Sequence, residues 1–509
     1  MRTTTVCITI RQRKRNLPKV PHQQKVRIFR HRSFSMRPTL FTIWKPSRFS
    51  TTRKQLTGKA RTRHRYSVRR LTAWWISLRT MVSERLSLTS PLQTLKFIYF
   101  MNAFNGVIIN KRHGGLVRAT DTSDRTVLLV CGGTAIVGKL ENYKPVFLNS
   151  LYALEQLGCT EDTDTKNKEL LYYHTSETFR LSPEKELWVM VVPKAGKVSE
   201  LMTNGQFLSG LRSVSGVNTI GIAGLTADSG IEAAANASQL MVKKMREDHI
   251  YIDTVLLEGL GTYVDTIADV SDLRELDAEN ISVIIAQDKD VALKDEAYKN
   301  HAAVGSALGM LSVRYVHENM GSVDIENHPR TAKGTPDYSM IDTTSGRWIN
   351  PALSNGTLMT DVSKSDQTTL NDKGYIYANS FQGYTGVFLS NSHTCVDKAS
   401  DYAYIEYNAV WNKAAKLVRN TLIPRVRGKV NADPSTGYIA TDTISYWDSL
   451  VRKSLDTMVN AGDIADFDIY INPSQMAVSD KPFNIQVKMV ANGVVHEFEI
   501  DLGFTNKID

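Results

Sequence analysis

The sequence VLLVCGGTAIVGKL at positions 127–140 begins as a short apolar run and continues through a pair of glycines. An apolar run of this length that ends at glycine is typical of a buried strand. From Gly133 the spacing G-x-x-x-x-G-K also matches part of a phosphate-binding loop, in which Lys139 would reach the terminal phosphates. Leu140, however, stands where a hydroxyl should bind magnesium, and magnesium needs oxygen ligands. We therefore expect Gly133 and Gly138 to shape a turn after a strand.

Similar apolar runs recur along the chain and predict further strands of one sheet. They are 187–192 (LWVMVV), 217–223 (VNTIGIA), 252–257 (IDTVLL) and 281–286 (ISVIIA). Runs without polar alternation are typical of largely parallel sheets that are covered on both faces. Helical patterns separate the runs, and one helix is expected to open at Ser229 with a capping box to Glu232. This order predicts an α/β fold with a mixed sheet and flanking helices.

A long helical pattern follows the last of these strands, over residues 295–319. It carries a stripe of small residues, which predicts close packing against another helix: Ala302, Gly305, Ser306 and Gly309. Residues 322–373 are rich in Ser, Thr, Asp, Gly and Pro, a composition typical of loops. We assign residues 126–321 to an α/β domain and 322–373 to a loop-rich insertion or linker.

Residues 374–509 are predicted to form a carboxy-terminal α+β domain. Two short strands, 374–380 and 385–391, are expected to pair around Gln382-Gly383. A helix from Asp401 toward Pro424 and a second helix ending at Gly462 each carry an apolar stripe at steps of three and four, typical of an amphipathic helix. The stripes are Tyr404, Tyr407, Trp411, Ala414, Val418 and Leu422, then Ile444, Trp447, Val451, Leu455 and Met458.

The end of the chain carries a pattern that predicts a β-hairpin. Apolar residues alternate with polar ones over 483–489, Asn492-Gly493 offers a turn, and Phe498, Ile500, Leu502 and Phe504 alternate over the last stretch. Asn-Gly between alternating runs favours a tight hairpin turn. A hairpin at a chain end has an open edge, which accepts a strand from another chain unless it is protected.

The charge of the chain divides sharply near residue 100. Residues 1–100 hold 24 Lys or Arg and one acidic residue, so residues 101–509 keep 38 of the 62 basic and 51 of the 52 acidic residues, a net charge of −13. Three interpretations of the basic segment are open: a nucleic-acid-binding arm, a targeting segment, or a reading frame extended upstream of Met101. We favour the last, so residues 1–100 are not expected to belong to the mature fold, and residues 101–125 form an amino-terminal arm.

Several classes of function lack their usual motifs. No apolar run approaches the ~18 residues of a membrane span, and the four cysteines show no metal-binding spacing. His317 and His328, beside Glu318 and Glu326, fit no standard metal site. His393 and Cys395 lack the third group that would orient a nucleophile and its base. We therefore predict no catalytic, cofactor or metal site, and a protein that is not an enzyme, with a P-loop-like nucleotide hydrolase as the alternative.

The order of four stretches carries a resemblance to a known family. They are TVLLVCGGTAIVGKLENYKPVFLNSLYALEQLG (126–158), LWVMVVPKAG (187–196), HAAVGSALGMLSVRYVHENMGSV (301–323) and GYIYANSFQGYTGVFLSNSHTCVDKASDYAYIEYNAVWNKAAKLVRNTL (374–422). With the closing hairpin, this order resembles the contractile tail sheath proteins of phages and of phage-like injection systems. The resemblance extends from about Met101 to Asp509.

The resemblance implies a structural subunit of a virion tail or phage-like particle, assembled in the bacterial host cytoplasm. Such a subunit polymerises as stacked hexameric rings around a tail tube protein and meets baseplate and tail terminator proteins, without a membrane and without nucleic acid. Neighbouring subunits would exchange strands at the chain ends. The residues expected to take part are Val107, Ile109, Phe498, Ile500, Leu502 and Phe504.

Overall fold

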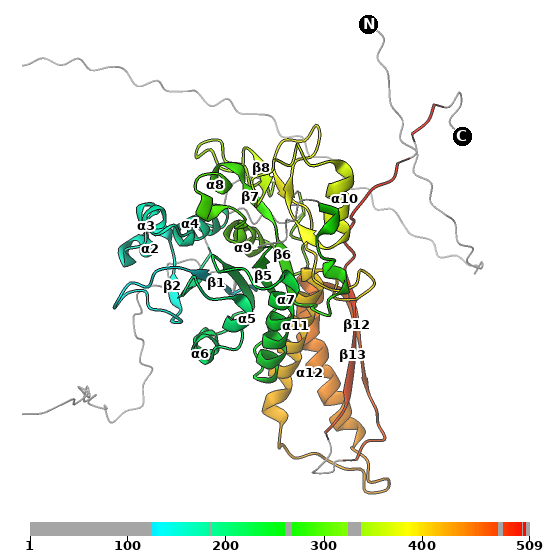
Figure 1. Cartoon of the computed structure of the whole chain (residues 1–509). Coiled ribbons are helices and arrows are strands. Elements are labelled where there is room, and N and C mark those ends of the chain that lie inside the picture. Colours follow the sequence, from blue (N-terminus) through cyan, green and yellow to red (C-terminus); the bar gives the residue numbers. More distant parts are fainter. Residues whose placement is uncertain are drawn as a thin grey trace, which may run out of the picture. The chain divides into compact units, whose positions relative to one another are not determined.

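The computed structural model describes residues 124–183, 185–259, 267–323, 337–476, 482–500 and 502–504 (Figure 1). Almost all of them belong to one unit, Gly114–Glu499, and a second unit combines Met1–His113 with Ile500–Asp509. The predicted basic segment and most of the predicted arm lie outside the described residues.

A seven-stranded sheet forms the centre of the α/β part, in the order β2-β3-β1-β4-β5-β6-β9. Its strands are β1 (Val127–Gly132), β2 (Val146–Leu148), β3 (Leu187–Val192), β4 (Thr219–Ala223), β5 (Thr254–Glu258), β6 (Ile281–Ile284) and β9 (Tyr375–Ile376). All pairings are parallel except that of β2 with β3. The predicted mixed sheet is therefore confirmed. Because β9 belongs to it, the sheet continues past the predicted loop-rich segment 322–373.

Helices cover both faces of this sheet, as the burial of β1 requires. Leu128 and Val130 face a core built with α5 (Val198–Leu201), α6 (Gly205–Ser213) and α7 (Ile231–Glu247). Leu129 and Cys131 face the opposite core, built with α2 (Leu151–Leu157), α4 (Leu171–Leu181) and α9 (Val304–Ser312). The remaining helices of this part are α3 (Glu161–Asn167), α8 (Lys289–Ala292) and α10 (Lys364–Asp372).

Two predicted helix limits are wrong. Helix α7 begins at Ile231 with Gly230 at its N-cap position, so Ser229 lies one residue too early and no capping box forms. Helix α9 is much shorter than the predicted 295–319 segment. Asn300 interrupts that segment because its backbone is left-handed, with φ 71°, a conformation that a helix cannot contain.

The predicted small-residue stripe brings α9 against α4. A Cβ atom at Gly305 would lie 2.2 Å from the backbone oxygen of His174, and one at Gly309 would lie 2.9 Å from the Cβ of Leu181. Both distances are far below van der Waals contact. Glycine at these two positions is therefore what allows the two helices to touch along their backbones.

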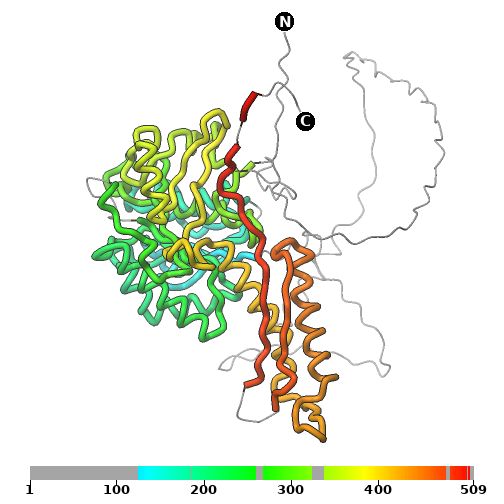
Figure 2. The backbone as a smooth tube through the Cα atoms, turned by 90° about the vertical axis from the view of Figure 1, so that its right-hand side faces the viewer, coloured from blue at the N-terminus to red at the C-terminus, as the bar shows by residue number. Residues whose placement is uncertain are grey.

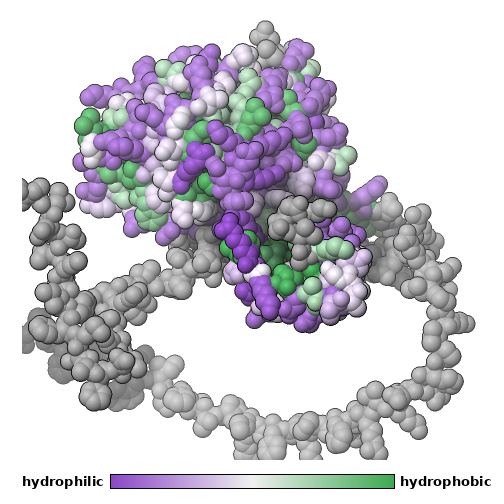
Figure 3. Space-filling view, turned by 90° about the horizontal axis from the view of Figure 1, so that it is seen from below, coloured by the Kyte–Doolittle hydropathy of each residue, from purple (hydrophilic) through white to green (hydrophobic). Residues whose placement is uncertain are grey.

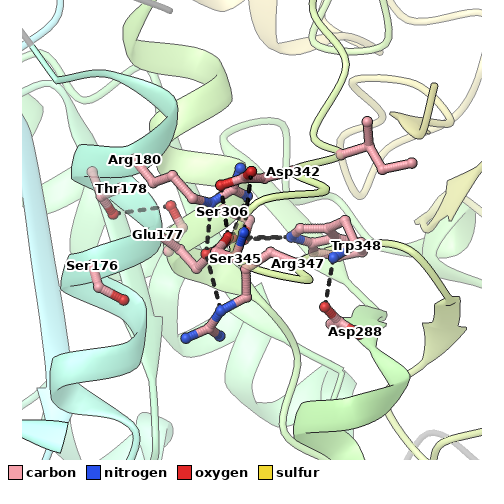
Figure 4. A network of polar contacts seen from close by, with 12 residues as sticks. Ser176, Glu177, Thr178, Arg180, Asp288, Ser306, Asp342, Ser345, Arg347 and Trp348 are labelled. Atoms are coloured by element: carbon pink, nitrogen blue, oxygen red, sulfur yellow. Dashed lines mark hydrogen bonds and ion pairs between the residues drawn. The ribbon is translucent and has the colours of Figure 1, made fainter.

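A buried polar network fixes the loop before β8 (Pro351–Leu353) to α4 and α9 (Figure 4). The carboxylate of Glu177 accepts hydrogen bonds from Arg180 (2.7 Å), from Ser306 (2.9 Å) and from the indole of Trp348 (3.0 Å). The backbone amide of Trp348 donates to Asp288 (2.6 Å), at the end of β7 (Ala286–Asp288). Strand β8 pairs with β7, so the end of this loop is held both by the contacts of Trp348 and by the strand that follows it.

The carboxy-terminal part contains α11 (Ile405–Leu422), α12 (Thr441–Asn460), β12 (Ile464–Ile471) and β13 (Ile485–Ala491). Figures 1 and 2 show the two helices side by side, with β12 and β13 running along them. Both predicted helices and the predicted pair of short strands, β10 (Ala378–Asn379) and β11 (Phe388–Leu389), are confirmed. Strand β12 was not predicted.

Candidate functional site

The two-stranded ribbon of β12 and β13 is the candidate contact site between subunits. One face of the ribbon is apolar because Phe467, Ile469 and Ile471 pair with Met489, Val487 and Ile485. This face packs on α12, where Val451, Leu455 and Met458 are buried. Viewed from below, the molecule exposes apolar surface at the end of this part of the chain (Figure 3).

Within the described residues the ribbon contains only β12 and β13. Each strand therefore has one edge along which no other described strand pairs. An unpaired edge presents backbone N–H and C=O groups at the spacing that another strand needs. The outward side chains are mixed: Tyr470 and Val490 are about half-exposed, beside Asp466, Asp468 and Lys488. Within the described part of the chain, both edges are therefore candidates for pairing with a further strand.

The predicted carboxy-terminal β-hairpin is present as β12 and β13, but its predicted turn at Asn492-Gly493 is wrong. Strand β13 pairs with β12, across the loop that follows Ile471, and residues 492–500 form no strand. The side chain of Asn492 instead donates to the backbone carbonyl of Gly462 (2.5 Å), just before β12. This bond closes the ribbon at the end from which the carboxy-terminal tail of the chain, residues 492–504, leaves β13.

The four tail residues predicted to exchange strands are highly exposed. Their exposed fractions are 81% for Phe498, 68% for Ile500, 70% for Leu502 and 107% for Phe504. Val107 and Ile109 lie outside the described residues. Four large apolar side chains at alternate positions without cover are suited to a contact with another sheet. Their part in strand exchange stays a prediction.

Helix α11 is joined to the amino ends of β5 and β6 by buried amides. The Asn412 side chain donates to the Asp253 carboxylate (2.8 Å), and the Asn408 side chain donates to the backbone carbonyl of Glu279 (2.7 Å). Burial raises the pKa of Asp253 to about 7, although the charge of Arg125 acts against the rise. These contacts fix the base of the carboxy-terminal helices on the sheet.

A second polar junction ties the start of β12 to the α/β part. The carboxylate of Asp463, which is buried, contacts the His317 ring (Nδ1–Oδ1, 3.0 Å) and the Lys413 ammonium group (2.6 Å). Lys413 also pairs with Asp124 (2.8 Å), just before β1. Burial opposes the charged form of Asp463, but the bonds from His317 and Lys413 outweigh it and lower its pKa. Asp463 could not be predicted from the sequence, because an isolated acidic residue before a strand carries no local signal.

We expect Asp253→Asn to change the pH dependence of the free energy of unfolding. The folded-state pKa of about 7 lies above the ordinary value of 3.8, so the native state keeps a proton that the unfolded chain releases between these values. The stability from this proton is complete below pH 3.8 and is lost as the pH rises to 7. Asparagine does not titrate. Relative to the natural protein, the variant should therefore gain about 2 to 3 kcal/mol between pH 5 and pH 8 in urea denaturation.

The matched control for this change is Asp442→Asn, at an exposed position in the first turn of α12. It removes the same charge at an exposed position, so it separates the general effect of losing a carboxylate from the effect of the buried site. A difference between Asp253→Asn and the natural protein that stays constant between pH 5 and pH 8 would contradict an uncharged Asp253 in the native state at pH 5.

The glycine loop after β1 differs from a phosphate-binding loop. Residues 133–140 form a turn closed by the bridge between Ile136 and Leu140, and the chain continues into β2 rather than into a helix. The Lys139 ammonium group donates to the backbone carbonyl of Gln156 (3.0 Å). A P-loop runs directly into a helix whose amino end faces the phosphates. The expected turn is confirmed, and Gly138 is left-handed within it, with φ 74°.

The residues that could have formed a nucleophile and base or a metal site are buried or partly buried among structural contacts or lie outside the described residues. Cys395 is fully buried, and burial raises its pKa to about 12. Burial and then the charge of Arg274, which donates to its Nδ1 (2.6 Å), lower the pKa of His393 to about 2. His328 and Glu326 lie outside the described residues. Where the structure describes the chain, no three His, Cys, Asp or Glu side chains are arranged to hold a metal ion.

Two solved structures that match this chain are a prophage baseplate chain and a sheath tail protein. A chain of the anti-feeding prophage baseplate is similar over 80% of this chain and 100% of its own length, with 14% identity and a TM-score of 0.50. A sheath tail protein from Desulfitobacterium hafniense matches 76% of this chain and 100% of its own, with 10% identity and a TM-score of 0.39. The first similarity confirms, at the level of the fold, the resemblance predicted from the sequence.

Sequence comparison assigns the family. No curated protein sequence matches the chain. The family model described as "DUF2586, N-terminal domain" matches residues 104–393, and that described as "DUF2586, C-terminal domain" matches residues 401–509. These matches include more than half of the chain. The chain belongs to the DUF2586 family.

Proposed function

We propose that this protein is a structural subunit of a contractile tail sheath. It polymerises through its own copies, as hexameric rings in a helical sheath, around a tail tube protein. Contraction of the sheath drives the tube through a target envelope. The observation that carries the proposal is the two-edged ribbon of β12 and β13, followed by a tail with four exposed apolar residues at alternate positions.

The ribbon and the tail are complementary parts of one contact. A strand needs an unpaired backbone edge and an apolar row to pack beside, and the ribbon offers both. The tail offers an alternating row in Phe498, Ile500, Leu502 and Phe504. If the tail of one copy pairs as a strand with the ribbon of the next copy, every copy donates one strand and accepts another. Such a head-to-tail contact generates rings or helical polymers rather than closed dimers.

The similarity in fold to a chain of the anti-feeding prophage baseplate supports a place in a contractile particle. Baseplate and tail terminator proteins are the further partners that we propose, and a virion tail or phage-like particle is the proposed location. None of the described helices has the length and apolarity needed to cross a bilayer. We also propose that the protein is not an enzyme, because a polymer that works by rearranging its contacts needs no catalytic centre.

Negative-stain electron microscopy of the purified full chain tests this function. We expect tubes or stacked rings that lengthen as the protein concentration rises, because each added copy extends a head-to-tail contact. Light scattering on the same samples should increase with concentration. Monomers only, at every concentration and salt condition tested, would contradict the proposal.

A further inference from the structure

A cleft of about 430 Å³ lies at the carboxyl ends of the central strands. Gly132 ends β1, Gly224 follows β4, and Lys194 follows β3, and all three line the cleft. Strands β3 and β4 pair with opposite sides of β1, so the direction of chain winding reverses at this point. In open α/β sheets, ligands bind in the crevice at such a reversal.

Most of the ionisable side chains that line the cleft are basic. Lys168, Lys194, Lys299 and His301 face it, against the single carboxylate of Glu169. Glu169 is buried, and the hydrogen bond that its carboxylate accepts from the hydroxyl of Thr134 stabilises its negative charge. Among the residues that line the cleft, basic groups therefore outnumber carboxylates, while carboxylates outside the lining pair with three of the four basic groups. An anionic ligand in the cleft would compete with those carboxylates for the basic groups.

Lys194 is the best placed of these cations. Its ammonium group donates to the backbone carbonyl of Asn167 (2.9 Å), and among the described residues no carboxylate lies within ion-pair distance. Lys168 and Lys299 each pair with one exposed carboxylate, Asp295 (3.3 Å) and Glu296 (3.2 Å). Surface pairs of this kind are weak. All three lysines can therefore turn toward a ligand at little cost.

His301 supplies a donor with a fixed orientation. Its Nδ1 contacts the Glu258 carboxylate (3.1 Å), and the backbone amide of Gly224 donates to the same oxygen (2.8 Å). Burial opposes the charged form of His301, but the charge and hydrogen bond of Glu258 outweigh it and raise its pKa. With Nδ1 engaged by Glu258, the other ring nitrogen is the one free to donate to a ligand in the cleft.

The backbone around the cleft adopts uncommon conformations. Lys168 and Asn300, which both line it, are left-handed, with φ of 54° and 71°. Gly224 is also left-handed, with φ 71°, and a Cβ there would lie 3.1 Å from the oxygen of Gly132. At Lys168 this conformation ends helix α3, and at all three positions it lets the chain turn sharply around the cleft.

We propose that this cleft binds a small oxyanion, the chemistry shared by a free phosphate ion and an acidic side chain of another copy of the chain. Lys194 would contact the anion directly, His301 would donate a hydrogen bond, and Lys168 and Lys299 would complete the charge. The site is separate from the ribbon and does not depend on the proposed assembly.

Titration of the unassembled full chain with inorganic phosphate, at constant ionic strength and by calorimetry or phosphorus NMR, tests the site. We expect saturable binding that Lys194→Gln weakens about tenfold, as the loss of one charge-assisted hydrogen bond should. His301→Gln should weaken it as well. Lys139→Gln is the matched control, because Lys139 is also exposed and also donates to a backbone carbonyl (3.0 Å). It should leave phosphate binding unchanged.

A second titration with acetate identifies the source of the anion. Binding of phosphate without acetate supports a free ion, whereas comparable binding of acetate that Lys194→Gln also weakens supports a carboxylate from another copy. No saturable binding of either anion would overturn the proposal, as would equal losses in Lys194→Gln and Lys139→Gln. Because these titrations use the unassembled chain, their failure would leave the sheath proposal intact.

Discussion

Replacing Ile500 and Leu502 together with aspartate is expected to abolish tubes and rings. Both side chains are more than two-thirds exposed in the single chain, so the substitutions should not disturb folding. In a strand contact they would meet the sheet of a neighbour and place unpaired charges in an apolar setting. The desolvation penalty is several kcal/mol for each charge. Negative-stain electron microscopy, beside circular dichroism of the same sample, measures both effects.

The control for this double variant is Leu240→Asp on α7. Leu240 is 67% exposed, almost the same as Ile500 and Leu502, but it lies outside the tail. This variant introduces the same kind of charge and should form ordinary tubes. If the double variant also formed ordinary tubes, the tail would not connect the subunits.

Replacing Gly305 with alanine is expected to destabilise the α/β part strongly. The new methyl group would lie 2.2 Å from the backbone oxygen of His174 and 2.7 Å from its carbonyl carbon. Backbone atoms cannot turn aside as side chains do, so α9 and α4 must separate. We expect a loss of about 4 kcal/mol or more in the free energy of unfolding, at the upper end of single substitutions. Thermal and urea denaturation measure it.

Gly205→Ala is the matched control for the clash. Gly205 begins α6, and a Cβ atom there would meet no heavy atom within 4 Å. Alanine favours helix over glycine by about 1 kcal/mol at most, so this variant should be neutral or slightly more stable. Similar stabilities for the two variants would mean that α9 and α4 do not meet through Gly305.

The central sheet could be predicted because its signals are local. Strands β1, β3, β4, β5 and β6 match the predicted apolar runs, such as LWVMVV for β3, whereas β2 and β9 at the two sides of the sheet were not predicted as members of it. The small-residue stripe on α9 also allowed its close packing against another helix to be predicted, because Gly305 and Gly309 have no side chain to separate the two helices. The limits of that helix could not be predicted, because contacts distant in sequence fix the left-handed backbone at Asn300. One of them is the hydrogen bond that the backbone amide of Asn300 donates to the backbone carbonyl of Ser354 (2.9 Å).

The pairing of the last strands depended on tertiary packing. Asn492-Gly493 is a strong local turn signal, but β13 finds in β12 a partner whose apolar face matches its own and also packs on α12. Burial of that shared face outweighs the preference of a two-residue turn. The sequence IADFDIYI of β12 alternates only partly, so its role was not evident without α12 beside it.

The polar junctions and the cleft could not be predicted for a different reason. Asn408 and Asn412 lie one turn apart on α11 and would be assigned to a solvated face, yet both are buried. Residues such as Lys168 and Lys194 are brought together only by the strand order. Buried polar residues carry no hydrophobic pattern, so the topology must be known before they can be grouped.

The way the ribbon is attached determines how it would carry mechanical load. Strand β12 joins the rest of the chain through Asp463, and the tail leaves β13 after Ala491, which pairs with Ile464 at that same end. A pull on the tail away from the body would therefore act first on the stacking of His496 on Tyr404 (ring centroids 4.8 Å), and then on the bond from Asn492 to Gly462 and on this pair. Antiparallel strands loaded at one shared end open one residue pair at a time, whereas strands pulled from opposite ends must break all their pairs together. Tension along the tail thus meets small resistances at His496 and then at Asn492, and the packing of the ribbon on α12 must bear the rest.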